Sequence, residues 1–182
     1  QIKNYKNKHS QNFETLKQFY ENKKNWLFGF LVYDLKNEIE NLSSENEDRL
    51  AFPDLYFFEP KYLFKINSGE EESKLQIEIN DASPDSSIAK NIFNEILETE
   101  IKESERKSNV NVKAKVSKED YTNSVKKIKQ HIQRGDIYEL NYCIEFFAEE
   151  AEIDPKEIYF RLNILSPMPF SCFLRDENHY LI

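Results

Sequence analysis

The chain has 182 residues, enough for one domain with a sizeable core. Its 33 acidic residues outnumber its 25 lysines and arginines and give a formal net charge of -8. Nucleic acids and anionic membranes attract concentrated positive charge, so this balance argues against both as partners. No apolar run reaches membrane-spanning length, and no signal peptide opens the chain.

The chain begins with a pattern that predicts a helix and then a strand. Residues 10–22 place apolar side chains on one side, with Ser10 in a capping position, as in an amphipathic helix. Residues 26–35 are apolar on both faces and predict a central strand covered on both sides. Gly29 within this strand indicates a close approach by a neighbouring backbone or side chain.

A hairpin and a second helix are predicted next. Residues 54–67 alternate as a strand that is interrupted at Pro60, and residues 74–79 return as the second arm of a hairpin. Ser83 then opens a helix, with Pro84 at its first helical position.

A polar linker at 102–110 and a short edge strand at 110–116 lead into the most regular helix of the sequence. Ser117 caps its start, and Asp120 stands where a capping box has its acidic residue. Gly135 follows its last turn, where a left-handed residue ends a helix. The apolar residues of this helix define one face: Tyr121, Val125, Ile128 and Ile132.

Alternation from Ile137 to Ala148 predicts a long, half-buried antiparallel strand. One face is wholly apolar, and the other carries Glu139, Asn141 and Glu145. These polar residues fit either an ordinary solvated sheet face or the polar floor of a cleft.

Asp154 and Pro155 begin the last helix, which Pro167 and Pro169 end. The chain then predicts a hairpin with its turn at 176–178. In all, the elements predict an α+β fold of antiparallel sheets with helices packed outside.

Cys143 and Cys172 fall on separate predicted strands. We expect buried free thiols in a reducing cytoplasm, with a disulfide as the lesser alternative. Neither has Cys or His neighbours at metal-ligand spacing, so the sequence predicts no zinc site. His9, His131 and His179 are scattered, and we expect them on the surface.

A distinctive run follows the helix that Ser117 caps: Gly135, Asp136, Ile137, Tyr138, Glu139, Leu140 and Asn141. It resembles the chorismate-binding enzymes that use ammonia, component I of aminodeoxychorismate (para-aminobenzoate) synthase and of anthranilate synthase. Glu139 departs from the glutamine usual in that family, and Asn141 resembles the para-aminobenzoate branch. The strand around Gly29, the DLYFFEPKYLF stretch and the segment after the last helix resemble the family in the same order.

The resemblance implies the N-terminal portion of a two-sheet α/β sandwich of the anthranilate synthase component I type. It divides the chain into 1–115, an N-terminal subdomain incomplete at its start, and 116–182, the truncated beginning of the chorismate-binding domain. The implied reaction aminates chorismate with ammonia from a glutaminase subunit (component II), on the route to para-aminobenzoate and folate. Magnesium is the implied cofactor.

The family's metal glutamates, catalytic lysine and chorismate-binding basic residues are expected after Ile182. We therefore assign no catalytic and no metal residue to this chain, and we expect the chain alone to be inactive. The segment after the last helix resembles the wall of a tryptophan pocket in feedback-sensitive members; it is alternatively a proline-stopped helix feeding a core strand. The residues of this implied tryptophan pocket are Met168, Pro169, Phe170 and Ser171.

Three other interpretations stay open at this point. The first is anthranilate synthase component I, on the route to tryptophan. A tryptophan-binding or subunit-docking module would have no chemistry of its own. An α+β domain with an accidental similarity is the third, although several matching segments in the family's order argue against it.

Overall fold

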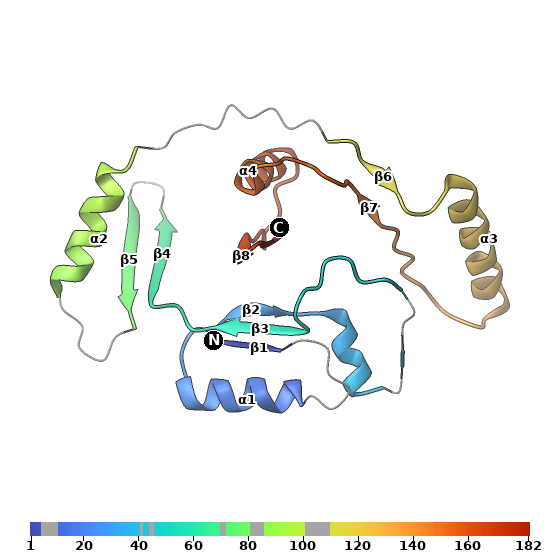
Figure 1. Ribbon diagram of the computed structural model, residues 1–182, viewed down its shortest axis with the longest axis horizontal. Coiled ribbons are helices and arrows are strands. Elements are labelled where there is room, and N and C mark those ends of the chain that lie inside the picture. The colour runs from blue at the N-terminus through green and yellow to red at the C-terminus, as the bar shows by residue number, and fades with distance from the viewer. Residues whose placement is uncertain (5–10, 41, 44–45, 70–71, 81–85, 101–109) are drawn as a thin grey trace. The chain divides into compact units, whose positions relative to one another are not determined.

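The computed structural model describes residues 1–4, 11–40, 42–43, 46–69, 72–80, 86–100 and 110–182. Figure 1 shows its helices and strands in chain order. The chain forms two compact units. The first unit is Gln1–Ile101 with Asp176–His179, and the second is Lys102–Arg175 with Tyr180–Ile182. The described elements mix helices with small antiparallel sheets, which confirms the mixed fold class. The predicted division into 1–115 and 116–182 stays a prediction.

The first unit contains a three-stranded antiparallel sheet in the order β1-β3-β2. Its strands are β1 (Ile2–Asn4), β2 (Phe28–Leu31) and β3 (Leu55–Phe58). The middle strand β3 begins at Leu55, which is completely buried, and Tyr56 beside it is buried too. The core of the unit therefore lies at the start of β3.

The prediction of a central strand at 26–35 is wrong. Among the described strands, β2 pairs only with β3, and Phe28 and Leu31 are exposed. The chain leaves the extended conformation after four residues and forms the 3-10 helix η1 (Tyr33–Glu38). Apolar residues on both faces show that a segment can be covered, but they do not fix its place within a sheet.

Gly29 confirms the predicted close approach. A Cβ atom built there would lie 1.9 Å from the backbone oxygen of Tyr56 and 2.7 Å from Phe57 Cα. Since β2 and β3 pair at Gly29↔Phe57, only a residue without a side chain fits this pairing.

Helix α1 (Asn12–Lys23) confirms the first predicted helix and lies against β1. Asn12, which is completely buried, accepts a hydrogen bond from Asn4 Nδ2 at 2.9 Å, and its backbone N–H donates to Glu38 Oε2 at 3.1 Å. The predicted cap Ser10 lies outside the described residues. The helix ends at Lys24, whose φ of 48° is left-handed.

The predicted hairpin is confirmed as β4 (Tyr62–Ser68) and β5 (Ser73–Ile79), after an interruption at Pro60. Helix α2 (Ser86–Glu98) follows and confirms the second predicted helix. Its predicted start at Ser83 and Pro84 lies outside the described residues, as does nearly all of the predicted linker.

The second unit begins with β6 (Lys113–Ala114), which confirms part of the predicted edge strand, and continues with α3 (Lys118–Arg134). Ser117 caps α3 as predicted, because its Oγ accepts the Asp120 N–H at 3.0 Å. Gly135 ends the helix with a φ of 82°, also as predicted.

The long strand predicted from Ile137 to Ala148 is wrong. Only β7 (Phe146–Phe147) is a strand, and it pairs with the two residues of β6. A strand exists through hydrogen bonds to a neighbour, and the described neighbour spans only those two positions. The alternating pattern is thus present without the pairing that would convert it into a sheet.

Helix α4 (Pro155–Leu165) confirms the last predicted helix, with Asp154 accepting the Lys156 N–H at 2.9 Å. The hairpin of β8 (Leu174–Asp176) and β9 (His179–Leu181) confirms the final prediction. Its turn is Glu177 and Asn178, because Asp176, which was predicted in the turn, belongs to β8. Within the part of the chain that the structure covers, no helix is long and apolar enough to span a membrane.

Both cysteines differ from the prediction in their burial and in their local structure. Cys143 and Cys172 are free, as expected, but both are exposed and neither lies on a strand. Their burial was predicted because both were placed on strands. Cys143 is exposed because the long strand does not form, and Cys172 lies before the start of β8 at Leu174.

Candidate functional site

The Gly135–Asn141 segment begins where α3 ends. The Gly135 N–H donates to Ile132 O at 3.0 Å, and the Asp136 N–H donates to His131 O at 3.0 Å. These two bonds satisfy carbonyl groups that a helix C-terminus otherwise leaves without partners. The helix end therefore fixes the path by which the segment leaves α3.

Asp136 is held by two cationic or ionisable neighbours from the last turn of α3. Its Oδ2 lies 2.8 Å from Arg134 Nη2 and 2.7 Å from His131 Nδ1. All three side chains are about half exposed or more, so these contacts orient Asp136 rather than contribute much stability. The exposed position of His131 agrees with the prediction.

The remaining residues of the segment face solvent. Tyr138 is 92% exposed, and Glu139 and Asn141 are exposed as well, while Ile137 is half-buried. Of the two interpretations of the polar residues, exposure favours the solvated face. Tyr142, the residue directly after the segment, stacks on Tyr121 of α3 with 5.5 Å between the ring centroids.

The predicted pocket residues lie in one turn after α4. The N–H and the Oγ of Ser171 both donate to Met168 O, at 3.3 and 3.0 Å. This turn leaves Met168 64% exposed and Phe170 95% exposed. Among the described residues, no hydrogen bond or ring contact joins it to the Gly135–Asn141 segment, so the two predicted groups are not brought together.

The first unit contains a charged cluster that sequence reasoning missed. Lys3 Nζ lies 2.7 Å from Asp176 Oδ2, and both side chains are largely buried. Burial raises the pKa of the nearby Tyr56 phenol, and the negative charge of Asp176 raises this pKa further. No local pattern signals this cluster, because its members come from opposite ends of the sequence.

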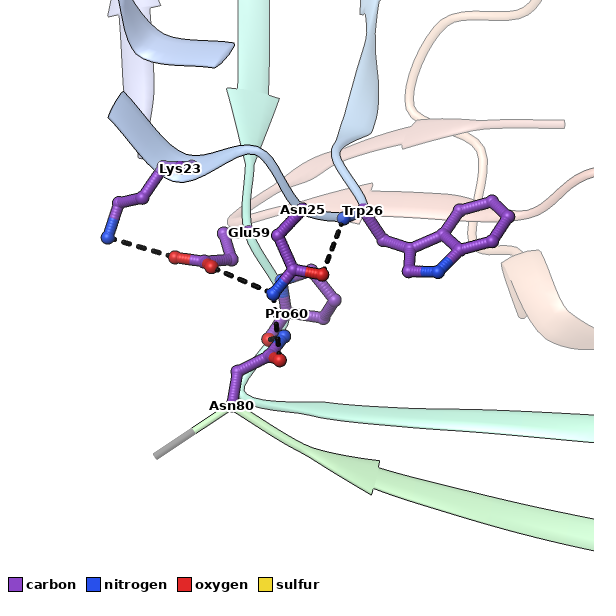
Figure 2. Close-up of polar contacts among 6 residues, drawn as sticks. All are labelled: Lys23, Asn25, Trp26, Glu59, Pro60 and Asn80. Atoms are coloured by element: carbon purple, nitrogen blue, oxygen red, sulfur yellow. Dashed lines mark hydrogen bonds and ion pairs between the residues drawn. The ribbon is translucent and has the colours of Figure 1, made fainter. Parts of the chain in front are cut away.

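A second missed cluster gathers around Asn25, between α1 and β2 (Figure 2). Asn25 donates to Glu59 and to Asn80, and Lys23 Nζ lies 2.9 Å from Glu59 Oε2. The hydrogen bond from Lys23 is the main cause that lowers the pKa of Glu59, against a smaller opposing effect of desolvation. A weak signal is the asparagine just after α1, a position that favours side-chain bonds to nearby backbone.

The described residues do not fit a magnesium site. Across the ranges that the structure covers, no group of three or more His, Cys, Asp or Glu side chains could hold a metal ion. Magnesium favours several oxygen ligands around one point. We therefore derive no chemistry through a metal from these residues.

The class that emerges is a mixed α/β protein with an exposed Gly-Asp segment at a helix end and an exposed proline-aromatic turn. The family model described as "chorismate binding enzyme" matches residues 2–182. The match covers nearly the whole chain, and the chain therefore belongs to this family.

Curated relatives divide between two kinds of synthase. The chain is 26% identical over 160 residues to aminodeoxychorismate synthase component 1 of Bacillus subtilis, covering 85% of this chain and 34% of the relative. It is 26% identical over 169 residues to anthranilate synthase component 1 of Acetivibrio thermocellus, with the same coverage, 85% and 34%. An anthranilate synthase component I-like protein of Synechocystis sp. is 26% identical over 152 residues, 83% of this chain and 30% of the relative.

The chain spans about a third of the length of these relatives, 34%, 34% and 30% in turn. No solved structure matches the chain significantly.

Proposed function

We propose that this chain forms part of component I of an aminodeoxychorismate synthase. The protein would aminate chorismate with ammonia released by a glutaminase subunit, on the way to para-aminobenzoate and folate, in the cytoplasm. The family match over residues 2–182 carries the chorismate-binding part of this proposal. The described elements would then contribute helices and antiparallel strands to the two-sheet sandwich of the family.

The choice of branch depends on Asn141. The aminodeoxychorismate synthase of Bacillus subtilis and the anthranilate synthase of Acetivibrio thermocellus are both 26% identical to the chain, so these two identities do not favour either branch. Asn141 carries the resemblance to the para-aminobenzoate branch, and its side chain is exposed and thus accessible to a partner or substrate. The alternative is an anthranilate synthase component I.

An assay with two distinguishable products tests the proposal. The protein that contains this chain is incubated with chorismate, ammonium and magnesium, and the products are separated by chromatography. Aminodeoxychorismate supports the proposal, whereas anthranilate would move the protein to the tryptophan branch. Conversion of chorismate to neither product would overturn the assignment to an amination reaction.

We also propose that the 182 residues alone do not catalyse amination. The chain spans about a third of its relatives, and the described residues include no group that could hold a metal ion. The same assay with the isolated chain should give no product above a reaction without protein. Product formation by the isolated chain, abolished by a chelator, would refute this.

Tryptophan binding is a second candidate function, and the turn after α4 favours it. Met168 and Phe170 are both more than half exposed and thus available to an aromatic ligand. Calorimetric titration with L-tryptophan should give heat that Phe170→Ala removes. The control Phe160→Ala changes another exposed phenylalanine and should leave the titration unchanged. Equal heats for both variants would contradict this site.

A further inference from the structure

The β4–β5 hairpin follows the three-stranded sheet after a short interruption between Phe58, the last residue of β3, and Tyr62, the first residue of β4. Among the described strands, neither arm of the hairpin pairs with a strand of that sheet. The hairpin itself is continuously paired, from Tyr62↔Ile79 to Ser68↔Ser73. Strand pairing therefore does not fix the orientation of the hairpin relative to the sheet, and the contacts around the interruption gain importance.

Asn25 makes the contacts that bridge the interruption. Its Nδ2 donates to Glu59 Oε1 at 3.1 Å and to Asn80 Oδ1 at 2.8 Å. Its Oδ1 accepts the N–H of Trp26 at 2.8 Å, and Figure 2 shows the amide between these partners. A side-chain amide has two N–H donors, and both are in use here. Such a saturated group suits a structural role better than ligand binding.

Asn80 completes the bridge from the hairpin side. Its Nδ2 donates to Pro60 O at 2.7 Å, and its backbone N–H donates to Lys61 O at 2.9 Å. The residue after β5 thus holds the residues just before β4. Because Asn80 also accepts from Asn25, one chain of hydrogen bonds runs from the sheet side to the hairpin.

One further contact from the hairpin to the sheet side involves a cation and an aromatic ring. Lys65 Nζ of β4 lies 4.7 Å from the centroid of the Trp26 ring, which is 55% exposed. In Figure 2 the Trp26 indole points away from the amide cluster. These bridging contacts are polar and lie near solvent, where water competes with them.

We propose that Asn25 is a latch that fixes the angle between the hairpin and the sheet, with the interruption at 59–61 as the hinge. When the latch opens, the hairpin moves as a unit, because its own backbone hydrogen bonds do not pass through Asn25. The sheet keeps its pairing for the same reason. The latch is a conformational device and is independent of the proposed function.

The sharpest variant is Asn25→Asp. A carboxylate has nearly the same shape and can still accept the Trp26 N–H, but it cannot donate to Glu59 or Asn80. The change therefore removes the hydrogen bonds to Glu59 and Asn80 and leaves the hydrogen bond from the Trp26 backbone N–H. The matched control is Asn67→Asp, the same change in charge on an exposed residue of the hairpin.

Pulsed electron paramagnetic resonance between two spin labels measures the opening. The labels are attached at Glu21→Cys on α1 and Lys74→Cys on β5, both exposed, after Cys143 and Cys172 are replaced by serine. The labelled chain and its Asn67→Asp variant should give one narrow distance. Asn25→Asp should broaden the distribution toward longer distances, with helix content by circular dichroism unchanged.

Asn80→Ala keeps the proposal testable if Asn25→Asp does not fold, since it removes the bridge from the hairpin side. It should broaden the distribution in the same way. Narrow, unchanged distances in every folded latch variant would overturn the proposal. A broad distance distribution in the labelled chain with Asn25 and Asn80 unchanged would also overturn the proposal. Equal broadening by Asn67→Asp would overturn it as well.

Discussion

Lys3 Nζ lies 2.7 Å from Asp176 Oδ2, and this ion pair within the first unit joins β1 to the last residue of β8. The two side chains are only 14% and 6% exposed. Lys3 Nζ also lies 5.9 Å from the centroid of the Tyr56 ring. The charges of Lys3 and Asp176 are both largely removed from water, so each offsets part of the desolvation cost of the other.

Removing one partner of this pair should be strongly destabilising. Lys3→Met leaves the Asp176 carboxylate buried without its cation, and breaking a buried pair in this way costs about 3–5 kcal/mol. The free energy of unfolding in urea measures the loss. The double variant Lys3→Met with Asp176→Leu should recover much of it, because no charge is then left buried. A double variant as unstable as the single one would contradict this interpretation.

Tyr56 should make the protein sensitive to alkali. Burial raises the pKa of its phenol above the ordinary value of 10.0, so the folded state keeps a proton that the unfolded chain releases. The contribution of the protonated Tyr56 phenol to the free energy of unfolding is fully present below pH 10.0 and is lost as the pH rises through the pKa of Tyr56 in the folded state. Urea unfolding at about pH 8 and about pH 11, on either side of the ordinary tyrosine pKa, measures it.

Tyr56→Phe is the matched control for that measurement. Its free energy of unfolding should fall less between the two pH values than that of the unchanged chain, since phenylalanine does not titrate. The same fall in both proteins would show that other groups cause the alkaline loss.

Gly29→Ala should destabilise the three-stranded sheet. The new methyl group would lie 1.9 Å from a backbone oxygen of β3, and a backbone atom in a paired strand cannot easily move away. Overpacking of this kind costs about 3 kcal/mol. The urea midpoint should drop clearly, and an unchanged midpoint would mean that the two strands are further apart than described.

Gly135→Ala should cost less, and for a different reason. No atom lies within 4 Å of a Cβ built there, but the φ of 82° is left-handed, which costs a residue with a side chain about 1–2 kcal/mol. Gly135→Asn should cost less than alanine, since asparagine tolerates this conformation. The melting temperature should be highest with glycine at position 135, lower with asparagine and lowest with alanine. Alanine equal to glycine would exclude backbone strain at this position.

Much of the local structure was predictable because its signals lie within a few residues. Ser117 and Gly135 mark the two ends of α3, and Asp154 marks the start of α4. The interruption at Pro60 separates β3 from β4 because proline has no N–H to donate to a ladder. Gly29 predicted a close neighbour, although not which strand supplies it.

The candidate site was predictable only as a stretch of sequence. The Gly135–Asn141 segment carries the resemblance, and the family match confirms the family, but exposure of Tyr138 and the contacts of Asp136 needed the structure. The alternating pattern after Ile137 predicted a strand that lacks a partner over most of its length. Periodicity shows which side chains share a face, and it does not supply the neighbour that a strand requires.

The sequence by itself determined the helices, their caps, the hairpins and the family, since each depends on residues close together in the chain. Only the tertiary structure decided the order β1-β3-β2, the exposure of Cys143 and Cys172, and the bridge from Asn25 to Asn80. The tertiary structure also decided that Lys3 and Asp176 form an ion pair. These features depend on which distant segments meet, and that is set by the path of the whole chain rather than by any local pattern.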